Sequence, residues 1–208
     1  MPKKNYFISF IGGIGAGKTT AMELVASALG FKSVREQYSQ NPFLPLFYKN
    51  MKRWAMHSQL FFLSEKISQL LEIKEMLAKE SIALDVDIRQ DMNYLEAQKE
   101  RGIISADERA LYYKIYRGVE KFLPKPNLIV YLKSNPVILR QRIKERGRSF
   151  ERGMTLAYLR SLVGAQEHWL RRNRGKLPIL IIDSDKLNFA NHDPHKQEFI
   201  DEIKKRLL

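Results

Sequence analysis

Several things are missing from this sequence, and each absence excludes a class of protein. There is no cysteine, which excludes a disulfide framework, a thiolate zinc site and a cysteine nucleophile. No apolar run approaches the roughly 18 residues that a membrane-spanning helix needs. The first apolar run, residues 6–11, meets two glycines and is too short for a secretory signal peptide. We therefore expect a protein of a reduced compartment, the cytoplasm, with no part in the membrane.

Positive charge is in excess. The 208 residues carry 36 Lys and Arg against 23 Asp and Glu, a formal net charge of +13, and 44% of them are apolar, enough for a good-sized core. Residues 133–176 hold twelve Lys and Arg against three Glu. Such a segment is a solvated helix face, a nucleic-acid footprint or a cluster that binds a polyphosphate. Composition leaves these interpretations open but indicates an anionic partner.

Short apolar runs alternate with longer stretches of helical periodicity. Five such runs joined by helical crossovers predict a parallel sheet with helices on both faces, a three-layer α/β/α fold. No repeat, low-complexity tract or long linker divides the chain, so we expect one domain over residues 1–208. The predicted strands are 6–11, 32–36, 81–86, 128–132 and 178–183. The predicted helices are 19–29, 52–79, 90–101, 106–122, one from 136, 155–172 and one from 193.

Two of the predicted helix starts carry specific end chemistry. Ser105 and Glu108 have the spacing of a capping box, in which each side chain binds the backbone N–H of the other residue. Asp193 followed by Pro194 is typical of an N-cap and a first-turn proline. A histidine lies on either side of that pair in an H-x-x-H spacing, and we expect a helix start there rather than a metal site.

A glycine-rich segment follows the first predicted strand. Residues 12–19 read GGIGAGKT and fit G-x-x-x-x-G-K-[ST], a P-loop, between a strand and a helix where that motif must lie. Glycines let backbone N–H groups approach phosphate oxygens, and the helix N-terminus adds positive potential. Lys18 would reach the β- and γ-phosphates, and the Thr19 hydroxyl would join the shell of a Mg²⁺ ion. The predicted phosphate-binding residues are Gly13, Ile14, Gly15, Ala16, Gly17, Lys18, Thr19 and Thr20.

The motif alone does not identify the acceptor of the phosphoryl group. No N-K-x-D base-reading motif follows the fourth predicted strand, which argues against a GTPase. The length of the chain and its basic second half fit a small-molecule kinase. Such enzymes close a mobile arginine lid that excludes water and balances the charge on the transferring phosphoryl group.

Further segments narrow the choice of phosphoryl acceptor. They are Arg35-Glu36-Gln37, Asn41-Pro42-Phe43, Phe47-Tyr48-Lys49, Lys52-Arg53-Trp54-Ala55 with Gln59, Asp85 with Asp91, and Arg142 and Arg146-Gly147-Arg148 with Glu151. In this order and spacing the chain resembles the deoxynucleoside kinase family, above all its short bacterial deoxyadenosine/deoxyguanosine kinase branch. The resemblance implies a nucleoside-kinase fold with strand order 2-3-1-4-5, ATP and Mg²⁺ as cofactors, a deoxynucleoside substrate, a role in nucleotide salvage, and a homodimer formed through the long helix and its neighbour.

The resemblance also implies roles for residues on the acceptor side. Glu36 would take the proton of the nucleoside 5′-hydroxyl, for which a carboxylate at a strand end is well placed. Tyr48 and Glu151 would bind the sugar 3′-hydroxyl. Gln59 and Asp91 would read the edge of the base, purine deoxynucleosides being favoured. Ordinary alternatives stay open. Glu36 is then a surface residue at a strand end, and Tyr48 packs beside Trp54. Gln59 then faces solvent, and Asp91 caps its helix.

On the donor side the resemblance implies a lid over about residues 142–153. Its arginines, Arg142, Arg146 and Arg148, would cover the ATP phosphates, although a solvated basic face is the ordinary alternative. Residues 186–189 would pack around the adenine of ATP.

The catalytic set implied by the resemblance combines both sides. Lys18 and Arg146 would stabilise the charge of the transferred phosphoryl group. Glu36 would take the proton. Thr19 and Asp85 would hold the magnesium ion, and Asp85 is also a candidate base.

The end of the third predicted strand departs from the family pattern. Family members carry an acid, an arginine and a serine there, and this chain carries Asp85-Val86-Asp87. Valine cannot donate a hydrogen bond or balance charge, so we expect slow turnover unless Arg35 or Arg89 substitutes. The alternatives are a P-loop nucleotide-binding protein with weak or lost turnover and a nucleic-acid-binding P-loop protein. For a slow kinase, Val86→Arg is predicted to raise kcat.

Overall fold

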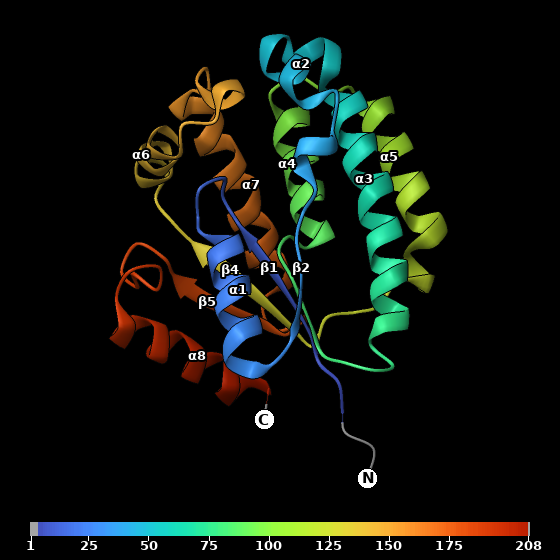
Figure 1. The fold of residues 1–208 in the computed structure, drawn as a ribbon. Coiled ribbons are helices and arrows are strands. Elements are labelled where there is room, and N and C mark those ends of the chain that lie inside the picture. The colour runs from blue at the N-terminus through green and yellow to red at the C-terminus, as the bar shows by residue number, and fades with distance from the viewer. Residues whose placement is uncertain (1–3, 208) are drawn as a thin grey trace.

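Five parallel strands form the centre of the computed structural model, which describes residues 4–207 (Figure 1). Their order across the sheet is β2-β3-β1-β4-β5, the order that the family resemblance implied. The parallel sheet with helices on both faces confirms the predicted three-layer α/β/α architecture. The strands are β1 (Phe7–Gly12), β2 (Lys32–Val34), β3 (Ile82–Leu84), β4 (Leu128–Lys133) and β5 (Ile179–Asp183).

Helices form the outer layers and join the strands. Within residues 4–207, none of them is both long enough and apolar enough to cross a membrane. They are α1 (Lys18–Leu29), α2 (Leu44–Lys49), α3 (Met51–Met76), α4 (Ile88–Glu100), α5 (Ala106–Val119), α6 (Pro136–Arg146), α7 (Leu156–Asn173) and α8 (Asp193–Leu207). Short 3₁₀ turns lie at Tyr38–Gln40, Glu120–Phe122 and Ser149–Glu151.

Alternate side chains of β1 pack against different helix layers. Phe7 belongs to an apolar cluster with buried residues of α3, α4, α5 and α7. Ile8 and Phe10 belong to a second cluster with α1 and α8 on the other face. All six residues of β1 are buried, as expected for the central strand of a parallel sheet that is covered on both sides. Figure 1 shows α3, α4 and α5 standing together, with α1 and α8 on the side of the sheet toward the viewer.

The element ends differ from the predicted ones in a few places. α2 has no counterpart among the predicted helices, because Pro42 and Pro45 resemble helix breakers in the sequence. Pro45 lies in the first turn of α2, where its missing N–H would have no helical partner anyway. β2 and β3 end at Val34 and Leu84, earlier than predicted. The long helix α3 ends at Met76, three residues before its predicted end.

The predicted capping box is present in the structure. The Ser105 hydroxyl accepts the Glu108 N–H at 3.2 Å, and the Glu108 carboxylate accepts the Ser105 N–H at 2.8 Å, so the capping box is complete. α8 begins at Asp193, as expected. The ring of His195 accepts the backbone N–H of Asn188 through Nδ1 at 3.0 Å, which ties the start of α8 to the loop after β5.

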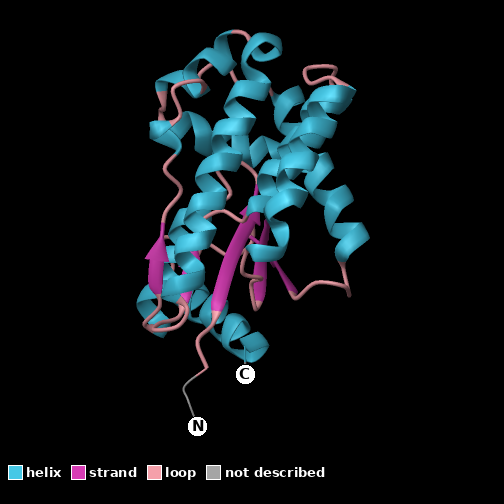
Figure 2. Ribbon diagram, turned by 90° about the vertical axis from the view of Figure 1, so that its right-hand side faces the viewer, coloured by secondary structure: helices cyan, strands magenta, loops and turns pink. Residues whose placement is uncertain are grey.

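Parallel pairing brings the carboxyl ends of the strands to one edge of the sheet. In Figure 2 the strand arrows point to that edge, and helices extend well beyond it. Phe7 of β1 is in register with Ile82 of β3, and Lys32 of β2 is in register with the same residue. The segments that follow β1, β2 and β3 therefore start side by side, and a site built from them must lie at this edge.

Asp87 fixes the start of α4 against the sheet. It is buried and forms the N-cap of α4 by accepting the Arg89 N–H at 2.8 Å. Its carboxylate also accepts the Ser9 hydroxyl of β1 at 2.5 Å and the Arg89 guanidinium at 2.9 Å. Asp87 occupies the family serine position, and serine and aspartate are both favourable N-caps.

Replacing Asp87 by Ala should destabilise the fold. The change leaves the Ser9 hydroxyl and the Arg89 guanidinium without their carboxylate and removes a helix cap, and breaking a buried pair of this kind costs about 3 kcal/mol. Urea unfolding measures the loss, with Asp107→Ala, an exposed acid in the first turn of α5, as the matched control. Equal stability of the two variants would contradict this account of α4.

Candidate active site

The loop between β1 and α1 is shaped by its glycines. A Cβ atom on Gly13 would lie 2.4 Å from Cδ1 of Leu139 in α6, so any side chain there would force Leu139 to move. Gly15 and Gly17 have φ angles of +87° and +89°, in the left-handed region that favours glycine. The loop therefore wraps tightly over α6 and leads into α1 with its backbone exposed to the space above the sheet.

The side chain of Lys18 binds the backbone of this loop. Its ammonium group donates to the carbonyl oxygens of Gly12 at 3.0 Å and Gly13 at 3.1 Å. Burial lowers the pKa of Lys18, and the carboxylates of Asp85 and Glu36 oppose that shift. Its side chain lines the cavity described below, so the ammonium stands between the loop and the two carboxylates.

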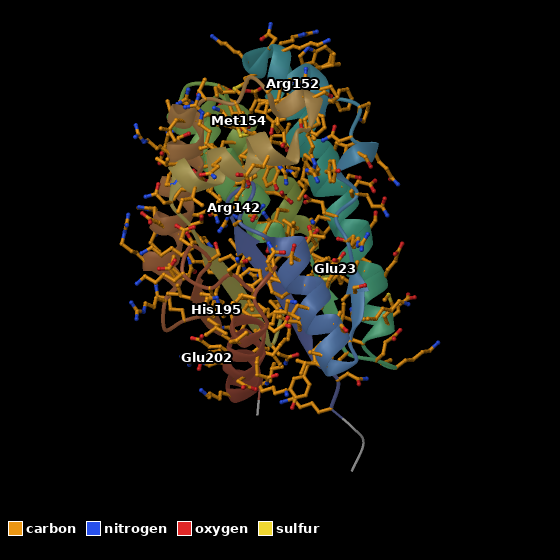
Figure 3. All side chains as sticks on the ribbon, turned by 60° about the vertical axis from the view of Figure 1, so that its left-hand side comes forward. Glu23, Arg142, Arg152, Met154, His195 and Glu202 are labelled. Carbon is orange, nitrogen blue, oxygen red and sulfur yellow. The ribbon has the colours of Figure 1, made fainter. Side chains whose placement is uncertain are left out.

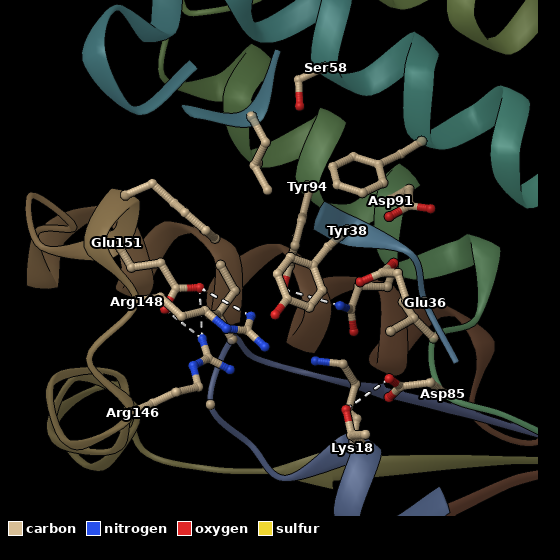
Figure 4. Close-up of a pocket in the computed structure, with 18 of the residues that line it drawn as sticks. Lys18, Glu36, Tyr38, Ser58, Asp85, Asp91, Tyr94, Arg146, Arg148 and Glu151 are labelled. Carbon is tan, nitrogen blue, oxygen red and sulfur yellow. Dashed lines mark hydrogen bonds and ion pairs between the residues drawn. The ribbon is translucent and has the colours of Figure 1, made fainter. Parts of the chain in front are cut away.

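Thr19 and Asp85 lie face to face at the start of α1. The Thr19 hydroxyl donates to Oδ2 of Asp85 at 2.8 Å, while Oδ1 of Asp85 is buried without a hydrogen-bond partner (Figure 4). Burial raises the pKa of Asp85, and Lys18 opposes the shift. A hydroxyl beside a carboxylate oxygen with no partner fits Mg²⁺, which is commonly held by one or two protein oxygens together with substrate phosphates. In the described part of the chain, no three His, Asp or Glu residues form a cluster that could hold a metal without a substrate.

Glu36 and Lys66 form an ion pair on the other side of the cavity. Glu36 follows β2, and 21% of its side chain is exposed. Its Oε1 lies 3.3 Å from the Nζ atom of Lys66, a buried residue of α3. Glu36 is therefore not an ordinary surface residue, because its carboxylate lies across the cavity from Lys18 (Figure 4).

Gln59 and Asp91 are buried polar residues at the far end of the cavity. Oε1 of Gln59 and Oδ2 of Asp91 have no hydrogen-bond partner, although each residue is only 5% exposed. Asp91 is not the cap of its helix, since Asp87 holds that position. Burial raises the pKa of Asp91 to about 7, and the nearby Lys66 opposes the shift. Buried polar atoms without partners are rare in native proteins and point to a ligand that supplies the partner.

Aromatic side chains form the wall beside these groups. Tyr48 stacks on Phe150, with ring centroids 5.8 Å apart, and meets Phe47 edge-on at 5.1 Å. Burial raises the pKa of Tyr48 well above its ordinary value, so its hydroxyl stays protonated and can donate a hydrogen bond. α2, the helix that the sequence pattern missed, carries Tyr48 to this wall.

Two of the three arginines of the predicted lid are held by one buried carboxylate. Glu151, 4% exposed, accepts the Arg146 guanidinium at 2.7 Å through both oxygens and lies 3.5 Å from Arg148. Arg148 also stands 3.8 Å above the ring of Tyr38. Arg142, near the middle of the view in Figure 3, donates to the Ser184 carbonyl at 2.8 Å. These contacts turn the arginines toward the cavity, unlike a solvated basic face.

Phe189 places the loop after β5 next to the P-loop. Its ring would lie 3.4 Å from a Cβ atom on Gly17 and stacks on Phe199 of α8, with centroids 4.9 Å apart. Phe189 is buried in the cluster that joins α1 to α8. The expected packing of residues 186–189 around an adenine stays a prediction.

Nearly all of the predicted site residues line one cavity of about 540 Å³. This volume suits a small organic ligand. Gly13 and Ala16 do not line the cavity, because both are buried inside the loop. The predicted residues that line it are Ile14, Gly15, Gly17, Lys18, Thr19, Thr20, Glu36, Tyr48, Gln59, Asp85, Asp91, Arg142, Arg146, Arg148 and Glu151.

Sequence reasoning missed several residues of this site. Gln90 accepts the Gly12 N–H at 2.9 Å and the Tyr94 hydroxyl lies 3.2 Å from its amide nitrogen, so α4 holds the P-loop directly. Tyr94 and Gln98 follow Asp91 at helical spacing and line the cavity with it. Lys66, missed as well, follows Gln59 by two turns of α3. In each case the spacing along a helix from a residue already singled out was the available signal.

The two arginines that the sequence offered as substitutes at Val86 both have carboxylate partners, although Arg35 lines the cavity. Arg35 is paired with Glu23 of α1, and 67% of its side chain is exposed. Arg89 is paired with Asp87. Val86 itself is buried, with 2% of its surface exposed, and lines the cavity.

Known proteins similar to this chain share its length and its fold. A family profile described as deoxynucleoside kinase matches residues 8–208. The deoxyguanosine kinase of Bacillus subtilis is 33% identical over 187 residues, which cover 88% of this chain and 89% of the relative. The deoxyadenosine/deoxycytidine kinase of the same organism is 26% identical over 203 residues, covering 96% and 92% of the two chains.

Solved structures of deoxyadenosine kinases have a similar fold. A deoxyadenosine kinase of M. mycoides with the products dCMP and a flexible dCDP bound has a TM-score of 0.85 and 22% identity, over 96% of this chain and 99% of that one. The M. mycoides deoxyadenosine kinase with bound dATP has a TM-score of 0.82 at the same identity, over 96% and 100%. At this identity the likeness establishes the fold.

The buried Asp91 should make stability depend on pH. Its pKa is about 7 in the folded chain against an ordinary value of 3.8, so between these values the unfolded chain loses a proton that the folded chain keeps. The contribution of Asp91 to the free energy of unfolding therefore falls as the pH rises through this window. The free energy of unfolding of Asp91→Asn relative to wild type should therefore be more than about 1 kcal/mol higher at pH 8 than at pH 5.

Urea unfolding at the two pH values measures this difference. Asp107→Asn, which removes an exposed carboxylate, serves as the control. A difference between wild type and Asp91→Asn that stays constant with pH would contradict a raised pKa.

Proposed function

Because the chain belongs to the deoxynucleoside kinase family, we propose that it transfers the γ-phosphoryl group of ATP to the 5′-hydroxyl of a deoxynucleoside, with purine deoxynucleosides favoured over deoxycytidine. One observation carries the proposal. The P-loop and the buried Gln59 and Asp91, which have polar atoms without partners, open into the same cavity, with Glu36 between them. A phosphate donor at one end and a base at the other place a sugar hydroxyl near the carboxylate.

In this proposal Glu36 accepts the proton of the 5′-hydroxyl. The new bond forms from the hydroxyl oxygen to the γ-phosphorus while the bond to the β-phosphate oxygen breaks, and ADP leaves with that oxygen. Lys18 moves its hydrogen bonds from the loop carbonyls to the phosphates. Arg146 balances the charge of the three equatorial oxygens. Thr19 and Asp85 would hold Mg²⁺, which would neutralise phosphate charge when it is bound.

The base would be recognised at the buried end of the cavity. Oε1 of Gln59 and Oδ2 of Asp91 can accept hydrogen bonds from N–H groups on the edge of a purine. The stacked rings of Tyr48 and Phe150 line the same cavity. The similar enzymes are named for deoxyguanosine, deoxyadenosine and deoxycytidine, so the choice of base depends on such contacts.

Two other functions are less well supported. A nucleic-acid-binding protein would present its arginines on an open surface, whereas Arg146 and Arg148 are bound to a buried carboxylate inside the cavity. A binding protein without turnover would not need Glu36 opposite the P-loop. Binding of a nucleic acid should also fall steeply with salt, whereas phosphorylation of an uncharged nucleoside should change little.

We further propose a homodimer through the long helix and its neighbour, and a lid over about residues 142–153 of one domain that spans the chain. Large apolar side chains support the dimer: Leu71 of α3 is 43% exposed, and Leu111 and Ile115 of α5 are 48% and 39% exposed. α3 and α5 pack against each other, so these side chains belong to adjoining helices. Burying them against a second copy would remove apolar surface from water.

Wild-type protein incubated with ATP, Mg²⁺ and a panel of deoxynucleosides and nucleosides should yield 5′-monophosphates, with purine deoxynucleosides preferred. Glu36→Gln should lower kcat by about 10²–10⁴ because the proton then has no acceptor. Glu65→Gln, an exposed residue of α3, is the matched control. ATP binding without any product from the panel would favour the binding protein instead.

The dimer is tested by light scattering on the same preparations. We expect wild type to have about twice the mass of one chain, which is 24.4 kDa. Leu111→Asp should shift the protein toward the monomer, because a charge would have to be buried at the interface. Val137→Asp on α6, also exposed, should leave the mass unchanged. A wild-type species of a single chain would rule out the dimer.

A further inference from the structure

The position of Val86 leaves a gap in the charge of the site. Val86 stands where the family pattern has an arginine, and its buried side chain lines the cavity without a charge. The two arginines that the sequence offers as substitutes do not fill this gap, since Arg35 and Arg89 are bound to Glu23 and Asp87. Either this chain lacks the cation or another element supplies it.

Lys66 of α3 does not line the cavity itself, but its ammonium reaches two residues that do. The Nζ atom lies 2.9 Å from the backbone carbonyl oxygen of Val86 and 3.3 Å from Oε1 of Glu36. The residue is 2% exposed, and its side chain is 3% exposed. The ammonium thus touches the backbone of the residue that replaces the arginine and the carboxylate proposed as the base.

The electrostatics keep this ammonium charged. Burial alone would lower the pKa of Lys66, but the surrounding carboxylates, Glu36 first and then Asp91, raise it above its ordinary value. An ammonium group so deeply buried is costly unless it is paired and hydrogen-bonded. Lys66 has both kinds of partner, which indicates that the charge is retained and directed at Glu36.

We propose that Lys66 is the positioning residue of this site, holding Glu36 toward the reacting hydroxyl and supplying the positive charge that Val86 cannot. The proposal rests on the proposed kinase function. With Oε1 held by the ammonium, the second oxygen of Glu36 accepts the proton. The cation acts across space from α3, so the arginine of the family pattern is replaced by a residue of another element.

Lys66 also lies near Asp91, and a role in reading the base is the competing explanation. The two roles separate kinetically. A residue that positions Glu36 acts in the transition state, so its loss lowers kcat and leaves the KM of the nucleoside nearly unchanged. A residue that reads the base changes the KM and the preference among bases.

The test compares Lys66→Met, which keeps the length of the side chain and removes its charge, with Lys74→Met, an exposed lysine two turns further along α3. We expect Lys66→Met to lower kcat about 10²–10³-fold, as loss of a single transition-state donor does. The KM values for nucleoside and ATP should stay within about threefold of wild type. Lys66→Arg should retain most of the activity.

The effect on kcat of adding a positive charge at position 86 should depend on whether Lys66 is present. We expect Val86→Arg to restore kcat at least tenfold in the Lys66→Met background and to bring no gain in wild type, where the place is already taken. Since an arginine at a buried position can prevent folding, Lys66→Ala assayed with added ethylammonium ions provides a second rescue, which should saturate. Circular dichroism and ATP binding show whether each variant is folded.

The outcomes separate the two proposals. An active wild type with an unchanged Lys66→Met overturns the role of Lys66 alone, and so does a rise in nucleoside KM with kcat retained. A gain from Val86→Arg in the presence of Lys66 also overturns it. A wild type that phosphorylates nothing overturns the kinase function and the Lys66 proposal with it.

Discussion

The parallel pairing of β1 with β3, Phe7 opposite Ile82, sets the geometry on which the rest of the cavity depends. It places the P-loop after β1 beside Asp85 after β3, so that the Thr19 hydroxyl and the Asp85 carboxylate meet at 2.8 Å. β2 pairs with the other side of β3, which brings Glu36 to the same edge. Helices that extend beyond the sheet then enclose the space above that edge.

Charge balance is the second constraint on the cavity. Its wall holds four acidic residues that are buried or partly buried, and a carboxylate in such a place needs a cation, a hydrogen bond or a proton. Each one meets this need differently. Glu151 has Arg146, Glu36 has Lys66, Asp85 has the Thr19 hydroxyl, and Asp91 has a pKa raised to about 7. A bound nucleoside and nucleotide would change the last two most, since each has an oxygen without a partner.

Local chemistry explains which features the sequence could predict. The capping box of α5 and the start of α8 depend on residues within four positions of one another. The phosphate loop depends on eight consecutive residues after a strand. The ends of β2 and β3 were misplaced because the paired register of both strands stops at Leu84, although β1 runs on to Gly12, and composition does not record where pairing stops. α2 was missed because prolines at the start of a helix resemble prolines that prevent one.

The sequence by itself determined the α/β/α fold, the P-loop and the membership in a kinase family, because these depend on periodicity and on short motifs. The tertiary structure alone decided which cation faces Glu36. Arg89 is only three residues from Val86 and Arg35 is next to Glu36 in the sequence, but a side chain leaves its backbone in a fixed direction, and these two are paired with Asp87 and Glu23. Lys66, 20 residues from Val86 in the sequence, reaches its backbone carbonyl from α3, which shares an apolar cluster with β3. Proximity in space follows from packing, which no local pattern contains.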